Sequence, residues 1–178
     1  MYIYIHQPQP FPMWSDIIHE FADSPSQSKV VRFLLENGFG INEAGRVACN
    51  GIEIPATQIA KAIGSDRRVV DATAHRILTI PSLREIFTRM RATPDLSNVA
   101  ESLGLAVITV LPNNASERGI VGAAVMVLNH HHLSIRQIFV TDAQFSEEPK
   151  LVIIVDGALP HGVIDEIRSL PQVKKIII

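Results

Sequence analysis

Residues 105–135 read LAVITVLPNNASERGIVGAAVMVLNHHHLSI, which joins an apolar run, a polar turn and a helical stretch without a break. The run 105–111 is short and rich in β-branched residues, as expected for a buried strand. After the turn, apolar residues recur at helical spacing over 119–130, and a second strand pattern covers 133–141. This stretch therefore predicts a β-α-β unit.

The rest of the C-terminal half continues the alternation. Strand patterns at 151–155 and 173–178 enclose a helical pattern at 160–170. The predicted order is β-α-β-β-α-β, which is the ferredoxin-like split βαβ arrangement. Residues 105–178 are therefore expected to form one small domain in an α+β protein.

The N-terminal half has a helical character. Helical patterns occur at 13–22, 27–37, 56–63, 66–79 and 82–90. Between the second and third of these, Asn50-Gly51 is a strong signal for a tight turn, so we expect a small hairpin within 39–55. Residues 13–92 are therefore predicted to form a helical domain that carries a hairpin.

Two further segments complete the predicted organisation. The stretch Ala92-Thr-Pro-Asp95 marks the domain boundary, and residues 93–104 are expected to form a linking helix that ends at Gly104. Residues 1–12 contain three prolines and are assigned to an N-terminal extension, either an edge strand or a tail.

The helices at 56–63 and 66–79 have the pattern of a helix-turn-helix, because a glycine, Gly64, separates two short amphipathic helices. Arg67 and Arg68 stand at the start of the second helix, where recognition side chains enter a DNA groove. Gln58 and Arg76 are candidates for phosphate contacts. The alternative is an ordinary helical pair in which Asp71, four residues after Arg67, forms a surface ion pair with it.

The turn before the helix at 119–130 is a candidate ligand site. Free N–H groups at a helix N-terminus attract anions such as a carboxylate, and Gly119 permits either a close approach or a positive φ angle. Asn113 and Asn114 offer amide groups for a polar ligand. The alternative is that these polar residues only close the loop and cap the helix.

Residues 104–178 resemble an ACT domain, in the stretches 119-GIVGAAV-125 and 132-HLSI-135. More broadly, residues 14–178 resemble the archaeal ACT-domain proteins described as predicted regulators of amino-acid metabolism. The likeness is carried by 51-GIEIP-55, 58-QIAK-61, 66-DRRVVDAT-73, 134-SIRQ-137 and 148-EPKL-151.

This resemblance implies a homodimer of ACT domains that binds an amino acid, or a similar small ligand, at the interface. One subunit would contribute the loop residues Asn113, Asn114, Arg118, Gly119 and Ile120, and the other would contribute Ser134, Ile135 and Arg136. Asn114 stands where the family has an acidic residue.

The composition suits a globular protein with a hydrophobic core. Hydrophobic residues make up 47% of the chain and charged residues 19%, and no apolar run is long enough to span a bilayer. We expect no membrane partner and no signal peptide. The single cysteine, Cys49, excludes an internal disulfide and suits the reducing cytoplasm. Residues 26–92 contain ten Lys and Arg against six Asp and Glu, a balance of +4 that is modestly favourable to nucleic acid.

Two functions follow from these observations. The first is a ligand-sensing regulator in which the ACT dimer controls a DNA-binding helix-turn-helix. The second is a ligand-responsive module that contacts a metabolic enzyme without DNA. No catalytic constellation or cofactor motif is present, so we expect neither an enzyme nor a bound cofactor. Adjacent residues on a helix point about 100° apart, so His130, His131 and His132 are expected to form an exposed helix end without a metal.

Overall fold

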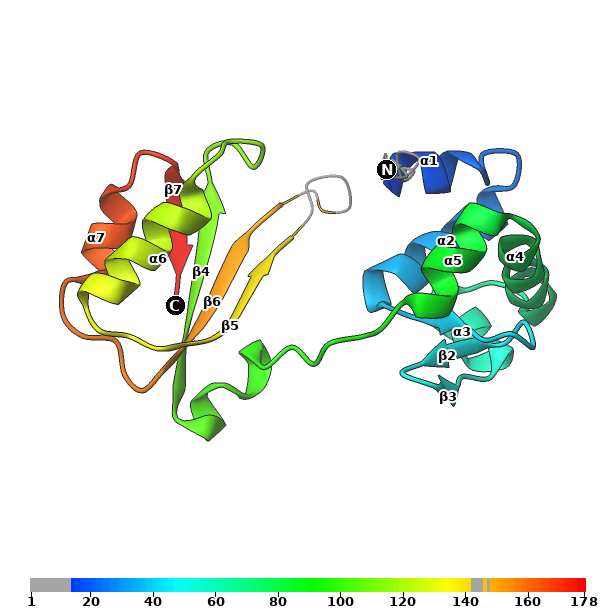
Figure 1. Cartoon of the computed structure of the whole chain (residues 1–178), viewed down its shortest axis with the longest axis horizontal. Helices are drawn as coiled ribbons and strands as arrows, with labels where there is room; N and C mark the ends of the chain where they lie inside the picture. Colours follow the sequence, from blue (N-terminus) through cyan, green and yellow to red (C-terminus); the bar gives the residue numbers. More distant parts are fainter. Residues whose placement is uncertain (1–13, 142–145, 147) are drawn as a thin grey trace, which may run out of the picture. The chain divides into compact units, whose positions relative to one another are not determined.

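The computed structural model describes residues 14–141, 146 and 148–178. The chain divides into two compact units, Met1–Thr93 and Pro94–Ile178, which we call unit 1 and unit 2 (Figure 1). The N-terminal extension that we expected over residues 1–12 lies outside the described residues. The prediction of a mixed α+β protein is confirmed, because helices and antiparallel sheets occur together.

Unit 1 is mainly helical and carries one small antiparallel sheet in the order β1-β2-β3. Its elements are α1 (Trp14–His19), α2 (Pro25–Asn37), β1 (Gly40–Ile41), β2 (Val47–Cys49), β3 (Ile52–Glu53), α3 (Ala56–Ile63), α4 (Arg67–Thr79) and α5 (Pro81–Arg89). Helix α4 packs against α2, α3 and α5. Its buried residues join a core that includes the fully buried rings of Phe21 and Phe87.

The predicted hairpin is present between β2 and β3. Asn50 and Gly51 both have positive φ angles, +49° and +89°, as a two-residue turn of the mirror-image type requires. The Asn50 carboxamide also holds the chain as it leaves unit 1, since it donates to the Ala92 carbonyl and accepts from the Ala92 N–H, both at 3.0 Å. Strand β1 extends the hairpin to a three-stranded sheet. The sequence pattern did not indicate β1, because two residues, Gly40 and Ile41, show no alternation.

Unit 2 is built on a four-stranded sheet. Its elements are the 3₁₀ helices η1 (Ser97–Val99) and η2 (Glu101–Leu103), then β4 (Leu105–Pro112), α6 (Ile120–His130), β5 (Ile135–Val140), β6 (Leu151–Asp156), α7 (Val163–Ser169) and β7 (Val173–Ile177). The strand order is β5-β6-β4-β7, and all neighbouring strands are antiparallel.

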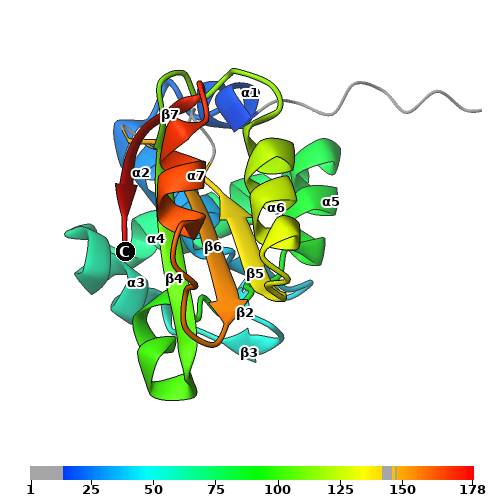
Figure 2. The ribbon, with the colours of Figure 1, turned by 90° about the vertical axis from the view of Figure 1, so that its left-hand side faces the viewer.

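Helices α6 and α7 cover one face of this sheet, as Figure 2 shows. Ile108, Ile153 and Leu128 are fully buried between the helices and the sheet. On the opposite face, Ile154 of β6 is buried together with Ala100, which comes from the segment before β4. Strand β6 is therefore buried on both faces, which explains its uninterrupted apolar sequence.

The prediction of one linking helix over residues 93–104 is wrong, because the structure has the two short 3₁₀ helices η1 and η2 there. The segment forms two single turns with hydrogen bonds between residues three apart, such as Val99 N–H to Leu96 O at 3.1 Å. The start of this segment is bound to strand β5 and does not extend into a regular helix. The Gln137 carboxamide of β5 accepts a hydrogen bond from the Leu96 N–H and donates one to the Pro94 carbonyl. So short a helix is only marginally stable, and these bonds together with the burial of Ala100 determine its shape.

Candidate functional site

Helices α3 and α4 form a packed pair joined by a tight turn. Gly64 ends α3 with φ +61°, as the sequence predicted. Asp66 then caps α4, because its carboxylate accepts a hydrogen bond from the Arg68 N–H at 2.7 Å. The turn and the cap therefore fix where α4 begins and how its first residues are oriented relative to α3.

Arg67 and Arg68 are exposed at the start of α4, and neither has an ion pair with any described residue. Asp71, the alternative partner of Arg67, instead lies 3.6 Å from Arg46. Gln58 is exposed on α3. The first turn of α4 thus presents two guanidinium groups to solvent, as a phosphate-binding surface requires.

Arg76, the fourth residue that we assigned to DNA contact, is occupied within unit 1. Its guanidinium donates to the Asp23 carboxylate at 3.0 Å, to the Gln27 side chain at 2.9 Å and to the Glu20 carbonyl at 2.6 Å. It also lies 4.7 Å above the centre of the Phe21 ring. These partners indicate that Arg76 joins α4 to the segment between α1 and α2.

We expect Arg76→Ala to lower the free energy of unfolding of unit 1 by about 2 kcal/mol, because it removes the hydrogen bonds to three partner residues and the stacking on Phe21. Arg89→Ala is the control, since Arg89 forms only an exposed pair with Glu85 that is worth about 0.5 kcal/mol or less. Urea denaturation followed by the fluorescence of Trp14, the chain's one tryptophan, measures both. Equal midpoints for the two variants would contradict this role of Arg76.

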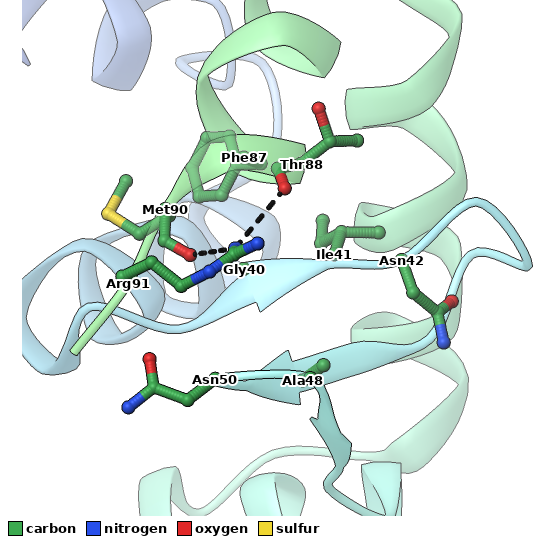
Figure 3. A pocket seen from close by; sticks show the side chains of 10 residues that line it. Gly40, Ile41, Asn42, Ala48, Asn50, Phe87, Thr88, Met90 and Arg91 are labelled. Carbon is green, nitrogen blue, oxygen red and sulfur yellow. Dashed lines mark hydrogen bonds between the residues drawn. The ribbon is translucent and has the colours of Figure 1, made fainter.

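Unit 1 also contains a hollow of about 100 Å³ between the small sheet and the end of α5 (Figure 3). The Arg91 guanidinium in its wall donates to the carbonyls of Thr88 and Met90. None of the residues that we assigned to ligand or DNA lines this hollow. It is therefore not part of the predicted site.

In unit 2, the asparagines of the predicted ligand loop are engaged by the protein itself. The Asn113 carboxamide donates to the Pro171 carbonyl at 3.0 Å, and the Asn114 side chain accepts from the Ser116 N–H at 3.0 Å. These contacts match the alternative in which the asparagines close the loop. Arg118 is exposed and has no ion pair with a described residue.

Gly119 directly precedes α6 and has φ +95°. A β-carbon added there would meet no atom within 4 Å, so the glycine meets a backbone requirement and not a close approach by the protein. No side chain caps the helix, and the first N–H groups, beginning with Ile120, point out of its end. An anion therefore has open access to this helix terminus.

The second half of the predicted ligand site lies at the other end of the sheet. Strands β4 and β5 are both antiparallel to β6, so they run parallel to each other. The loop follows the end of β4, whereas Ser134 precedes the start of β5 and Arg136 pairs there with Asp156. One chain therefore does not bring the loop together with Ser134, Ile135 and Arg136.

A second hollow, of about 180 Å³, lies beside the loop. Its lining includes Asn113 together with two side chains of opposite charge, Glu148 and Lys174. Both charged residues are exposed, and neither has an ion pair within the described part of the chain. Sequence reasoning missed Glu148 and Lys174 because they come from a loop and a strand far along the chain, 29 and 55 residues after Gly119. Only the pairing of β4 with β7 brings Lys174 to the hollow.

The edge of the sheet at β5 is open and apolar. Ile135, Ile138 and Val140 of β5 remain 37%, 38% and 63% exposed, and Met126 of α6 is 74% exposed. A hollow of about 300 Å³ runs between α6 and this strand, with Met126 and Ile135 in its wall. Such an edge presents free backbone groups and apolar side chains to another chain.

No protein-family model matches the chain, and no curated protein shows significant similarity to it. Among the described residues, no helix is long and apolar enough to cross a membrane.

Proposed function

We propose that the protein is a ligand-sensing regulator of amino-acid metabolism. Unit 2 pairs with a second copy and binds an amino acid or a similar small molecule, and unit 1 contacts DNA through the start of α4. The strand order β5-β6-β4-β7, with both helices on one face, supports the ferredoxin-like, ACT-type arrangement for unit 2. The packed pair α3 and α4 supports a helix-turn-helix for unit 1.

The observation that carries the proposal is the hollow beside the ligand loop. An amino acid is a zwitterion, and Lys174 and Glu148, two residues of opposite charge, both line this small hollow. Lys174 is suited to the ligand carboxylate, while Glu148 is suited to its ammonium group. In this proposal Glu148 takes the part of the acidic loop residue that ACT domains have where this chain has Asn114. The free N–H groups at the start of α6 offer a second contact for an anion.

We expect one or more amino acids to raise the melting temperature of the full chain, because a ligand that binds the folded state stabilises it. Lys174→Ala should weaken that ligand about tenfold or more, as the loss of one charge-assisted hydrogen bond does. Lys175→Ala is the control, since it removes the same charge from the next residue of β7 but Lys175 does not line the hollow. Calorimetric titration measures both variants. The proposed site is wrong if Lys174→Ala and Lys175→Ala bind the ligand equally.

Dimer formation follows from the position of the residues that the ACT resemblance implies. The loop and the start of β5 lie at opposite ends of the sheet within one chain, but two β5 edges related by a two-fold axis run antiparallel. The start of β5 in one copy then approaches the loop end of the other. The apolar side chains along this edge provide the buried surface that such pairing needs.

The exposed arginines at the start of α4 favour DNA over an enzyme as the partner of unit 1. Arg46, Arg84 and Arg89 each pair with a carboxylate, whereas Arg67 and Arg68 have no such partner among the described residues. We place this function in the cytoplasm, where the free thiol of Cys49 stays reduced.

A further inference from the structure

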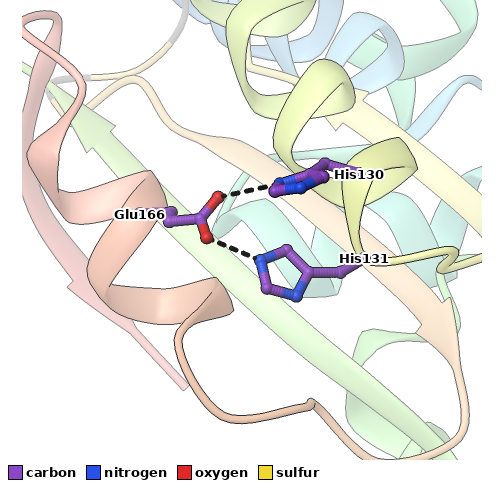
Figure 4. A group of neighbouring side chains, drawn as sticks. All are labelled: His130, His131 and Glu166. Atoms are coloured by element: carbon purple, nitrogen blue, oxygen red, sulfur yellow. Dashed lines mark hydrogen bonds and ion pairs between the residues drawn. The ribbon is translucent and has the colours of Figure 1, made fainter.

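Three side chains that could ligate a metal converge where α6 ends. The Glu166 carboxylate of α7 lies 2.9 Å from Nε2 of His131 and 3.6 Å from Nδ1 of His130 (Figure 4). The three groups offer donor atoms that all lie within 4.8 Å of one another. The sequence had predicted three exposed histidines, but only 18% of the His131 side chain is accessible.

The convergence depends on the carboxylate that α7 brings to the end of α6. His130 is the last residue of α6, His131 has φ −88° and ψ +11°, and His132 has φ +55°. Neighbouring side chains of a helix diverge, but Glu166 turns one carboxylate oxygen toward each of the two rings and so brings the three groups together. Figure 4 shows both imidazole rings turned toward the same carboxylate.

From this cluster we infer a binding site for a divalent transition-metal ion of the Zn²⁺ class, held by His130, His131 and Glu166. Two imidazole nitrogens and one carboxylate oxygen are ligands that zinc accepts, and the remaining coordination positions are open to water. The site lies apart from the hollow that we assign to the amino acid, whose wall contains none of these three residues.

The distances suit such an ion after a small adjustment. Ligand bonds of about 2.0–2.2 Å place the donors of a tetrahedral ion about 3.3–3.5 Å apart. The distances from the two Glu166 oxygens, 2.9 Å between Oε1 and His131 and 3.6 Å between Oε2 and His130, bracket that value, and the donor atoms all lie within 4.8 Å of one another. His130 is the group free to adjust, because 77% of its side chain is exposed. His131 and Glu166 already join α6 to α7, so they present two ligands in fixed positions.

The electrostatic state of the cluster also suits a cation. The Glu166 carboxylate supplies the negative charge of the cluster, and among the described residues its charge partners are the two histidines. The neighbouring Asp165 carboxylate forms an ion pair with Arg168 instead of with either histidine. A bound ion would hold the end of α6 on α7 and so restrain the turn that leads into β5.

The test is titration of the chelator-treated, tag-free full chain with Co²⁺, followed by visible absorption and by competition with Zn²⁺. We expect one Co²⁺ per chain with the intense bands of four- or five-coordinate cobalt. His130→Ala should weaken binding by at least about tenfold, since removing a partner even from the outer shell of a site costs that much. Because the His130 side chain is exposed, the His130→Ala variant should have the same melting temperature as the parent when both are measured in chelator.

Two further variants sharpen the result. Glu166→Gln keeps a side chain that can hydrogen bond to His131 but is a poor ligand, so it should also lose Co²⁺. His132→Asn removes the neighbouring imidazole at a residue with positive φ, which asparagine tolerates, and should bind as the parent does. The inference is overturned if the parent shows only the spectrum of hydrated Co²⁺, if His130→Ala and Glu166→Gln retain parent affinity, or if His132→Asn loses binding.

Discussion

Replacing Ile138 by Lys should convert the dimer that we propose into a monomer. Ile138 lies in the middle of β5, at the open edge of the sheet, and remains 38% exposed in the single chain. In a pair of β5 strands related by a two-fold axis, residues at the centre of the strand lie close to their own copies. The substitution would therefore bring two ammonium groups together at a surface that otherwise buries apolar side chains, and edge lysines oppose such pairing.

Light scattering of the full chain at micromolar concentration measures this change. Ile178→Lys is the matched control, because Ile178 is exposed beyond the end of β7, at the opposite edge of the sheet. Each variant should keep the parent's circular dichroism, since the aliphatic part of a lysine covers much of the surface that isoleucine covered. A monomeric parent, or a dimer that persists in Ile138→Lys, would show that this edge does not pair.

The double substitution Arg67→Ala, Arg68→Ala should abolish binding to DNA at physiological salt and leave weak binding at low salt. Both guanidinium groups are exposed at the first turn of α4 and have no ion pair with a described residue, so their removal disturbs no contact of the fold. If both neutralise phosphates, the slope of the logarithm of affinity against the logarithm of salt concentration should become shallower by about two. Gel shift with genomic DNA fragments at several salt concentrations provides the measurement.

The matched control is Arg84→Ala, Arg89→Ala, which removes the same charge from α5, where both arginines are paired with glutamates. An equal loss in both double variants would indicate a general charge effect and no specific surface at α4. Absence of any shift with the parent at low salt would exclude the DNA-binding half of the proposal. It would favour the alternative, a module whose unit 1 contacts a metabolic enzyme.

The sequence by itself determined the type and order of the main elements, because these depend on local physics. The spacing of apolar residues set the five strands and helices of unit 2 between residues 105 and 170 to within a few positions. Asn50-Gly51 specified its turn since both residues tolerate positive φ, and Gly64 ended α3 for the same steric reason. The α+β class and the exposed arginines at the start of α4 followed from such local patterns.

Only the tertiary structure decided which distant side chains meet. Arg76 has helical spacing and a positive charge like a phosphate contact, but packing places it on Asp23 and Phe21, more than fifty residues earlier in the chain. Likewise, Glu166 reaches His130 and His131 only because α6 and α7 pack side by side on one sheet. Strand order brings Lys174 beside the loop after β4 and carries Ser134 away from it. Periodicity within a segment contains no information on these pairings, since they depend on which faces of separate elements become buried together.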